Sequence, residues 1–155
     1  KIAASKSVSF KAGSELKTAE AAKTLLDSVA GENNALVSVT EVSKVYQGNG
    51  QGGAHNNEGG LLKFGTKSAE GKLTLNFGEA KLSKVVINCH DFYKVSADYP
   101  TNSNTIAING GEAVLAPYNA TGAGEDMEFT LDGASTLSIV ATNRIVIFSI
   151  TVYYK

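Results

Sequence analysis

The chain has 155 residues, of which 43% are hydrophobic and 19% are charged, and its formal net charge is −1. This length and composition are typical of a single domain, residues 1–155, that can bury a core without disulfides or metals. One arginine among 14 basic residues and a near-neutral charge argue against a nucleic-acid partner. No apolar run approaches the roughly 20 residues that cross a bilayer, so membrane insertion is not expected.

Cys89 is the only cysteine, so an internal disulfide and a cysteine-based zinc site are both excluded. It ends the apolar run at residues 85–89, and we expect it to be a small buried hydrophobe. The chain begins at Lys1, and no signal peptide is visible in it. We therefore expect an excised domain or a mature fragment.

Apolar residues recur at spacings of three and four between residues 14 and 30, which predicts one amphipathic helix. Gly31 follows at the position that glycine often takes after a helix. Residues 36–46 are rich in valine, threonine and serine and predict a strand with a bulge near Glu41.

Residues 47–60 are rich in glycine, asparagine and glutamine and cannot contribute to a core, so we expect a long mobile or ligand-facing loop. The segment contains a literal G-x-G-x-x-G pattern from Gly48 to Gly53. A dinucleotide site needs that pattern to open a helix, and here it leads into more glycine. Nucleotide binding is therefore not expected.

Short strands separated by glycine and asparagine turns fill the rest of the chain. The predicted strands cover residues 61–64, 72–77, 82–89, 105–108, 113–116, 127–131, 136–141 and 145–154. The last of them is predicted to place five side chains on one face: Val146, Phe148, Ile150, Val152 and Tyr154. This pattern indicates an all-β fold, an antiparallel jelly-roll β-sandwich with one N-terminal amphipathic helix.

Aromatic and amide side chains gather at the predicted strand ends and in the loops. Sugar recognition uses an aromatic face against the C–H face of the ring, with amides and carboxylates for the hydroxyl groups. Arg144 is the only arginine, which suggests a planar contact that lysine cannot make, either as a brace to a loop or to a ligand. The candidate ligand-binding residues are Tyr46, His55, Asn56, Asn57, Asp91, Tyr93, Tyr99 and Arg144.

Catalytic and metal motifs are absent from the sequence. There is no Gly-x-Ser-x-Gly, and His55 and His90 have no nearby histidine partner. No cofactor is expected and the chain is predicted not to be an enzyme, although a loop-borne carboxylate pair would leave no sequence signal. For a structural calcium ion, the candidate ligands are Glu125, Asp126 and Asp132.

Residues 46–154 resemble a domain of large secreted or surface proteins of Firmicutes and related bacteria. The segments that carry the resemblance are residues 62–66, 71–77, 84–89, 108–110 and 143–152. The resemblance implies a jelly roll similar to galactose-binding-like and carbohydrate-binding modules, which are accessory domains of nucleases, hydrolases and adhesins. The predicted helix departs from that pattern.

These observations lead to the expectation of a non-catalytic accessory module that binds carbohydrate, on a glycan or a host or cell-surface polymer. It is expected to be a monomeric module within a larger bacterial protein that is secreted or on the cell surface. Two alternatives stay open. One is a structural or protein-interaction module of the adhesin type, and the other is a hydrolase with loop carboxylates.

Overall fold

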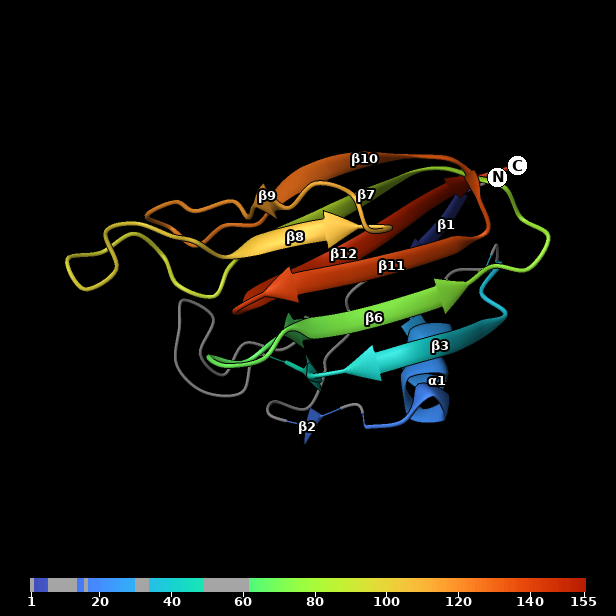
Figure 1. The fold of residues 1–155 in the computed structure, drawn as a ribbon, viewed down its shortest axis with the longest axis horizontal. Coiled ribbons are helices and arrows are strands. Elements are labelled where there is room, and N and C mark those ends of the chain that lie inside the picture. Colours follow the sequence, from blue (N-terminus) through green and yellow to red (C-terminus); the bar gives the residue numbers. More distant parts are fainter. Residues whose placement is uncertain (1, 6–13, 16, 30–33, 49–61) are drawn as a thin grey trace.

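The computed structural model describes residues 2–5, 14–15, 17–29, 34–48 and 62–155. Two antiparallel β-sheets pack face to face, with one helix beside them (Figure 1). The first sheet contains β1 (Ile2–Ser5), β2 (Ser14–Glu15), β4 (Val45–Gln47), β5 (Leu62–Phe64), β7 (Leu82–Asp91), β10 (Glu125–Ala134) and β12 (Ile145–Tyr154). The second contains β3 (Ser38–Ser43), β6 (Gly71–Asn76), β8 (Thr105–Ile108), β9 (Val114–Leu115) and β11 (Thr136–Thr142).

The order of the strands gives the sandwich its connectivity. The first sheet runs β10-β7-β12-β5-β4-β2, with β1 also paired to β12, and the second runs β3-β6-β11-β8-β9. From β6 to β12 the chain passes back and forth between the two sheets, as in a jelly roll. The predicted all-β sandwich with one helix is therefore confirmed.

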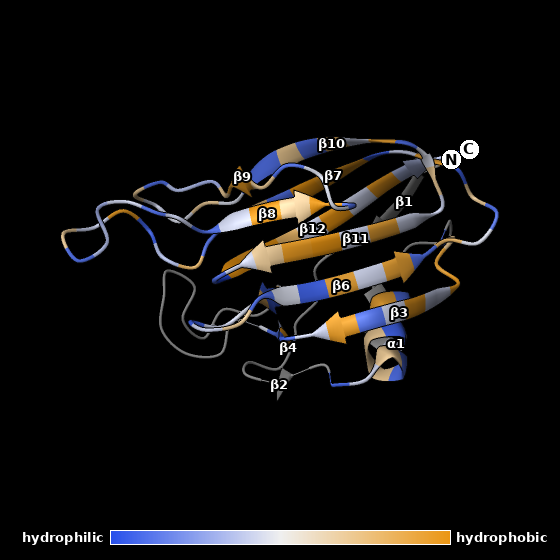
Figure 2. Ribbon diagram, in the orientation of Figure 1, coloured by the Kyte–Doolittle hydropathy of each residue, from blue (hydrophilic) through white to orange (hydrophobic). Residues whose placement is uncertain are grey.

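The core lies between the sheets and is built by alternation. Along β6 every second side chain is buried, including Leu73 and Leu75, and its partner β11 contributes Leu137 and Ile139. Figure 2 shows apolar residues recurring along these strands. Each fully buried leucine or isoleucine contributes about 1.5–3 kcal/mol. Cys89 is buried as expected, and burial raises the pKa of its thiol to about 12.

The helix is shorter than the predicted range of residues 14–30. It is α1 (Ala19–Val29), and the prediction is wrong for Ser14 and Glu15, which form β2 against β4. The helix begins where the hydroxyl of Thr18 accepts a hydrogen bond from the backbone N–H of Ala21 (3.1 Å), because that bond satisfies a donor of the first turn. None of the described helices is long and apolar enough to cross a membrane.

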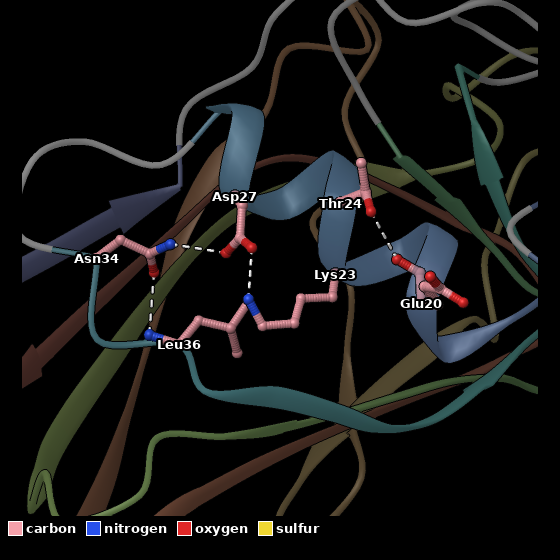
Figure 3. A network of polar contacts seen from close by, with 6 residues as sticks. All are labelled: Glu20, Lys23, Thr24, Asp27, Asn34 and Leu36. Atoms are coloured by element: carbon pink, nitrogen blue, oxygen red, sulfur yellow. Dashed lines mark hydrogen bonds and ion pairs between the residues drawn. The ribbon is translucent and has the colours of Figure 1, made fainter.

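Side-chain contacts tie α1 to the segment that leads into β3 (Figure 3). The carboxylate of Asp27 binds the ammonium of Lys23 and accepts a hydrogen bond from the amide of Asn34 (2.8 Å). The contact with Lys23 lowers the pKa of Asp27. The amide oxygen of Asn34 in turn accepts the N–H of Leu36 (3.0 Å). Since Ala22 and Leu26 are buried, α1 covers part of the core beside β3.

The predicted strand at residues 36–46 is two strands in different sheets. The expected bulge is present, since the register of β3 with β6 shifts between Val39 and Glu41. At Lys44 the backbone adopts a φ of 53°, and the chain then enters β4 in the other sheet. This crossing places Tyr46 on the outer face of the seven-stranded sheet.

A bulge in β12 changes which side chains face the core. The register with β7 shifts between Ile147 and Ser149, so Phe148 is the extra residue. Because one inserted residue reverses the alternation, Val146 lies on the outer face while Ile150 lies in the core. The prediction of one shared face is therefore wrong for Val146 and Phe148, which pack with a second cluster outside the sandwich.

Candidate functional site

The outer face of the seven-stranded sheet carries a row of side chains at one end. Tyr46 on β4 pairs with Lys63 on β5, and Lys63 pairs with Val146 on β12. His90 on β7 completes the row opposite Val146. Phe64, the next residue after Lys63, is fully buried. Because side chains alternate along a strand, the row faces away from the core.

Phe92 covers this row. It is the first residue after β7, its side chain is 2% exposed, and it packs against Val146. The ammonium of Lys63 lies 4.1 Å from the ring centroid of Tyr46 and 5.8 Å from that of Phe92. Both distances are within the range of cation–π attraction.

Two tyrosines stack beside Phe92. The ring centroids of Tyr93 and Tyr99 are 3.8 Å apart, and the rings are inclined by 11°. The guanidinium carbon of Arg144 lies 5.0 Å from the centroid of Tyr93 and 4.5 Å from that of Phe92. A guanidinium N–H of Arg144 also donates a hydrogen bond to the hydroxyl oxygen of Tyr93. Arg144 thus makes planar and hydrogen-bonding contacts that a lysine would not reproduce.

Tyr99 is the exposed member of the stack. Its side chain is 43% exposed although one ring face lies on Tyr93. A hydrogen bond with Tyr93 raises the pKa of Tyr99. The connected set, here called the aromatic platform, consists of Tyr46, Lys63, Phe92, Tyr93, Tyr99 and Arg144.

The backbone of Arg144 holds both ends of the connection between β7 and β8. Its carbonyl oxygen accepts the N–H of Phe92 (3.2 Å) and the side-chain amide of Asn104 (2.7 Å). Phe92 opens this connection and Asn104 closes it. The residue that contacts the tyrosine stack therefore also fixes the loop that carries it.

A second segment, residues 117–119, runs beside that loop. Asp91 donates its backbone N–H to the carbonyl of Pro117 (2.8 Å), and Val95 donates to that of Asn119 (3.1 Å). The hydroxyl of Tyr118 donates to the carbonyl of Tyr99. These bonds hold the loop that carries Tyr93 and Tyr99 against the 117–119 segment.

Asp91 lies beneath the platform and is 1% exposed. One carboxyl oxygen accepts the N–H of Tyr93 (2.8 Å), and the other has no hydrogen-bond partner in the described part of the chain. Burial raises the pKa of Asp91, and interactions with Tyr93, Asn102, His90 and Arg144 oppose that effect only in part. The carboxyl is a structural support of the loop, and it is not placed to contact solvent.

The raised pKa of Asp91 predicts how an Asp91→Asn variant changes stability with pH. A carboxyl whose pKa is higher in the folded state than in the unfolded state stabilises the fold while it is protonated. This contribution is complete below the unfolded-state pKa of about 4, and it is lost as the pH rises through the folded-state pKa. We therefore expect Asp91→Asn to gain stability relative to wild type as the pH rises from about 4 towards neutral. Thermal unfolding of both proteins across that range measures the difference. Asp98→Asn, at an exposed position, is the control, and a difference that stays constant or falls with pH contradicts the prediction.

The structure brings together four of the candidate ligand-binding residues, Tyr46, Tyr93, Tyr99 and Arg144. Asp91 supports them from below. The remaining candidates, His55, Asn56 and Asn57, lie outside the described residues, as does most of the glycine-rich segment. The described part of that segment is Gln47, the last residue of β4, and Gly48, which bridges to Leu62.

Sequence reasoning missed Lys63, and it placed Phe92 among the aromatic residues at strand ends without selecting it as a candidate ligand-binding residue. Lys63 could have been found, since it is the polar residue between Leu62 and Phe64 and must therefore face outward. The direction of the Phe92 side chain could not be predicted, because a phenylalanine beside a strand end is equally compatible with the core. Its role depends on Val146, whose outward direction follows from the bulge in β12.

The candidate calcium ligands do not come together. Glu125 and Asp126 open β10, whereas Asp132 lies near its other end, roughly 20 Å away at the usual rise of a strand. Glu125 accepts a hydrogen bond from the amide of Asn119 (2.8 Å), and Asp126 accepts one from Asn88 (2.9 Å). Among the described residues no three histidine, cysteine, aspartate or glutamate side chains form a group suited to a metal.

Comparisons with known proteins complete the description. No protein-family model matches the chain, and no curated protein matches it. Among solved structures it is similar to a GH26-CBM35 β-(1,4)-mannanase of Podospora anserina, with 18% identity, a TM-score of 0.44, and coverage of 74% of this chain and 26% of that one.

Two further solved structures are similar. One is an exo-β-1,3-galactanase of Phanerochaete chrysosporium, with 17% identity, a TM-score of 0.40, and coverage of 76% and 30%. The other is a GH115 4-O-methyl-α-glucuronidase with specificity for decorated arabinogalactans, with 14% identity, a TM-score of 0.39, and coverage of 78% and 18%. The chain thus spans less than a third of each structure's length. At these identities and TM-scores the likeness carries no argument about function, so the site is interpreted from its own geometry.

Proposed function

We propose that this chain is a non-catalytic accessory module that binds carbohydrate on the aromatic platform. In this proposal it acts as a monomeric module within a larger protein that is secreted or on the cell surface. The observation that carries the proposal is Tyr99, an exposed ring held flat on Tyr93. A fixed, exposed aromatic ring offers a sugar the flat apolar surface that its C–H face needs, at little entropy cost.

The polar groups around the stack support the same interpretation. Lys63 and Arg144 lie among the aromatic rings and carry the N–H donors that sugar hydroxyls accept. The carboxyl of Asp91 is buried, so it is not available as a catalytic group. Hydrolysis of a glycosidic bond requires two carboxyl groups that both reach the substrate, roughly 5–10 Å apart, and a buried carboxyl does not reach it.

Replacing Tyr99 with alanine tests the proposal. We expect at least about a tenfold loss of affinity, or about 1.4 kcal/mol, because one stacking surface is removed while the fold stays intact. Native affinity gels with galactomannan, arabinogalactan, xylan, β-glucan and mucin measure the retardation of wild type and variant.

Tyr153→Ala is the matched control. Tyr153 also lies under a lysine, with the ammonium of Lys84 4.6 Å from its centroid, but it is at the opposite end of β12 from Arg144. We expect this variant to bind like wild type. If none of the polysaccharides retards the wild-type protein, or if both variants lose affinity equally, the proposed site is wrong.

The alternative of a protein-interaction module has one observation in its favour. Val114 and Leu115 on β9 are 41% and 56% exposed, and β9 is the last strand of its sheet. An exposed edge strand can pair with another chain. Because β9 has only two residues, this surface is smaller than the aromatic platform, and carbohydrate binding remains our proposal.

A further inference from the structure

His90 lies between the sheet and the segment that steadies the aromatic platform. Its side chain is 0% exposed. One ring nitrogen, Nδ1, is 2.8 Å from the carbonyl oxygen of Asp91, and the other, Nε2, is 3.0 Å from the backbone nitrogen of Asn119. A backbone N–H only donates and a carbonyl only accepts. Nδ1 therefore carries the hydrogen, Nε2 is the acceptor, and this geometry requires a neutral imidazole.

The acceptor role of His90 fixes the segment that leads to Tyr99. Asn119, which donates to Nε2, also accepts the N–H of Val95 in the loop of the tyrosine stack (3.1 Å). Tyr118 donates its hydroxyl to the carbonyl of Tyr99, and its ring centroid is 6.4 Å from that of His90. Two bonds thus connect the 118–119 segment, seated on His90, to the loop that presents Tyr99.

The turn after Asn119 is held by several hydrogen bonds to the Asn119 side chain. The side-chain oxygen of Asn119 accepts the backbone N–H groups of Thr121 (3.1 Å), Gly122 (2.8 Å) and Ala123 (3.2 Å). Its amide nitrogen donates to the carboxylate of Glu125 (2.8 Å). A shift of Asn119 away from His90 therefore moves the segment as a unit.

We infer that His90 is a positioning residue whose protonation releases the 118–119 segment and weakens ligand binding in acid. A second proton on Nε2 would set an N–H group against the N–H of Asn119 at 3.0 Å, where two donors repel. Tyr99 would lose the support that Tyr118 and Asn119 give its loop. This inference rests on the proposed function, because it concerns the regulation of the same platform.

Charged and titratable groups surround His90 on each element that packs against it. Asp91 is the next residue on β7, and its carboxyl interacts electrostatically with His90 and with Arg144. Tyr118 faces the ring from the adjacent segment, and Glu125 at the start of β10 is held through Asn119. On the other side Lys63 lies across Val146.

Solution NMR of the whole chain tests the linkage without a ligand. The spectra cover about pH 5 to pH 8, the interval in which histidine side chains change charge. In wild type we expect the amide signals of Asn119, Val95 and Tyr99 to shift with one common midpoint. In His90→Gln the carboxamide oxygen still accepts the N–H of Asn119 and does not titrate, so these signals should stay unchanged.

His55→Gln is the matched control, since His55 is the only other histidine. We expect it to titrate like wild type. The inference is overturned if the Asn119 and Tyr99 signals are constant across the pH range, or if they shift equally in His90→Gln. Should His90→Gln not fold, Tyr118→Phe takes its place: Asn119 should still shift, and the Tyr99 response should shrink. An undiminished Tyr99 response would contradict the linkage.

Affinity gels with the same polysaccharides at about pH 8 and pH 5.5 supply the second readout, since these values lie on either side of the ordinary histidine pKa of about 6.5. We expect wild type to lose roughly tenfold in affinity at the lower pH and His90→Gln to lose little. Failure of all polysaccharides to bind at either pH refutes the proposed function, while the NMR result still decides the linkage. Equal binding at both pH values, with the NMR shifts present, refutes the regulation alone.

Discussion

Gly65→Ala is expected to destabilise the protein by at least about 2 kcal/mol, since it combines backbone strain with a steric clash, each costing roughly 1–3 kcal/mol. Gly65 has a φ of +83°, and a β-carbon there would lie 1.7 Å from the backbone oxygen of Asn143. The backbone of Gly65 cannot retreat easily, because its N–H is bonded to the carbonyl of Lys44 (2.8 Å). Denaturant unfolding of wild type and variant measures the loss.

The same substitution bears on the site, because Asn143 directly precedes Arg144 and Gly65 directly follows β5. A clash there separates the strand ends that carry Arg144 and Lys63. Gly110→Ala is the control: its φ is +70°, but a β-carbon would meet no atom within 4 Å. Only backbone strain remains, so we expect a loss of about 1 kcal/mol. Equal losses for the two variants would show that the close approach at Asn143 does not matter.

Much of the fold could be predicted because the strands alternate regularly. The pattern of Leu73 and Leu75 is local, and it survives in the structure without change. The start of the helix and the face of Val146 could not be predicted in this way. The first depends on the pairing of Ser14 and Glu15 with β4, and the second depends on a one-residue bulge in β12. Both are set by a partner strand distant in sequence.

The candidate site could likewise be predicted only in part from the sequence. Tyr93, Tyr99 and Arg144 could be selected by residue type and by position near strand ends. That Arg144 contacts Tyr93, and that Tyr46 joins them through Lys63, follows only from the register of β4, β5 and β12. The candidate calcium ligands are separated for the reverse reason. Acidic residues close in sequence are held apart when they lie along an extended strand.

Phe92→Ala is expected to cost about 3 kcal/mol of stability and to abolish carbohydrate retention as well, because large-to-small changes of buried phenylalanine typically cost 3–5 kcal/mol. Phe92 is buried against Val146, and its ring makes an edge contact with Tyr93, with the centroids 5.0 Å apart. It also contacts the guanidinium of Arg144. Denaturant unfolding and native affinity gels measure the two effects.

Phe77→Ala is the control that distinguishes an effect on the aromatic platform from a general loss of stability. Phe77 is 5% exposed and belongs to the main core, which is distinct from the cluster of Phe92 and Val146. We expect a comparable loss of stability, about 3 kcal/mol, with unchanged affinity in the folded fraction. If Phe92→Ala keeps its affinity while losing as much stability as Phe77→Ala, Phe92 is only a packing residue. We expect loss of affinity in Phe92→Ala because the tyrosine stack depends on the Phe92 ring for its order. That ring contacts both Tyr93 and Arg144, which is hydrogen-bonded to Tyr93.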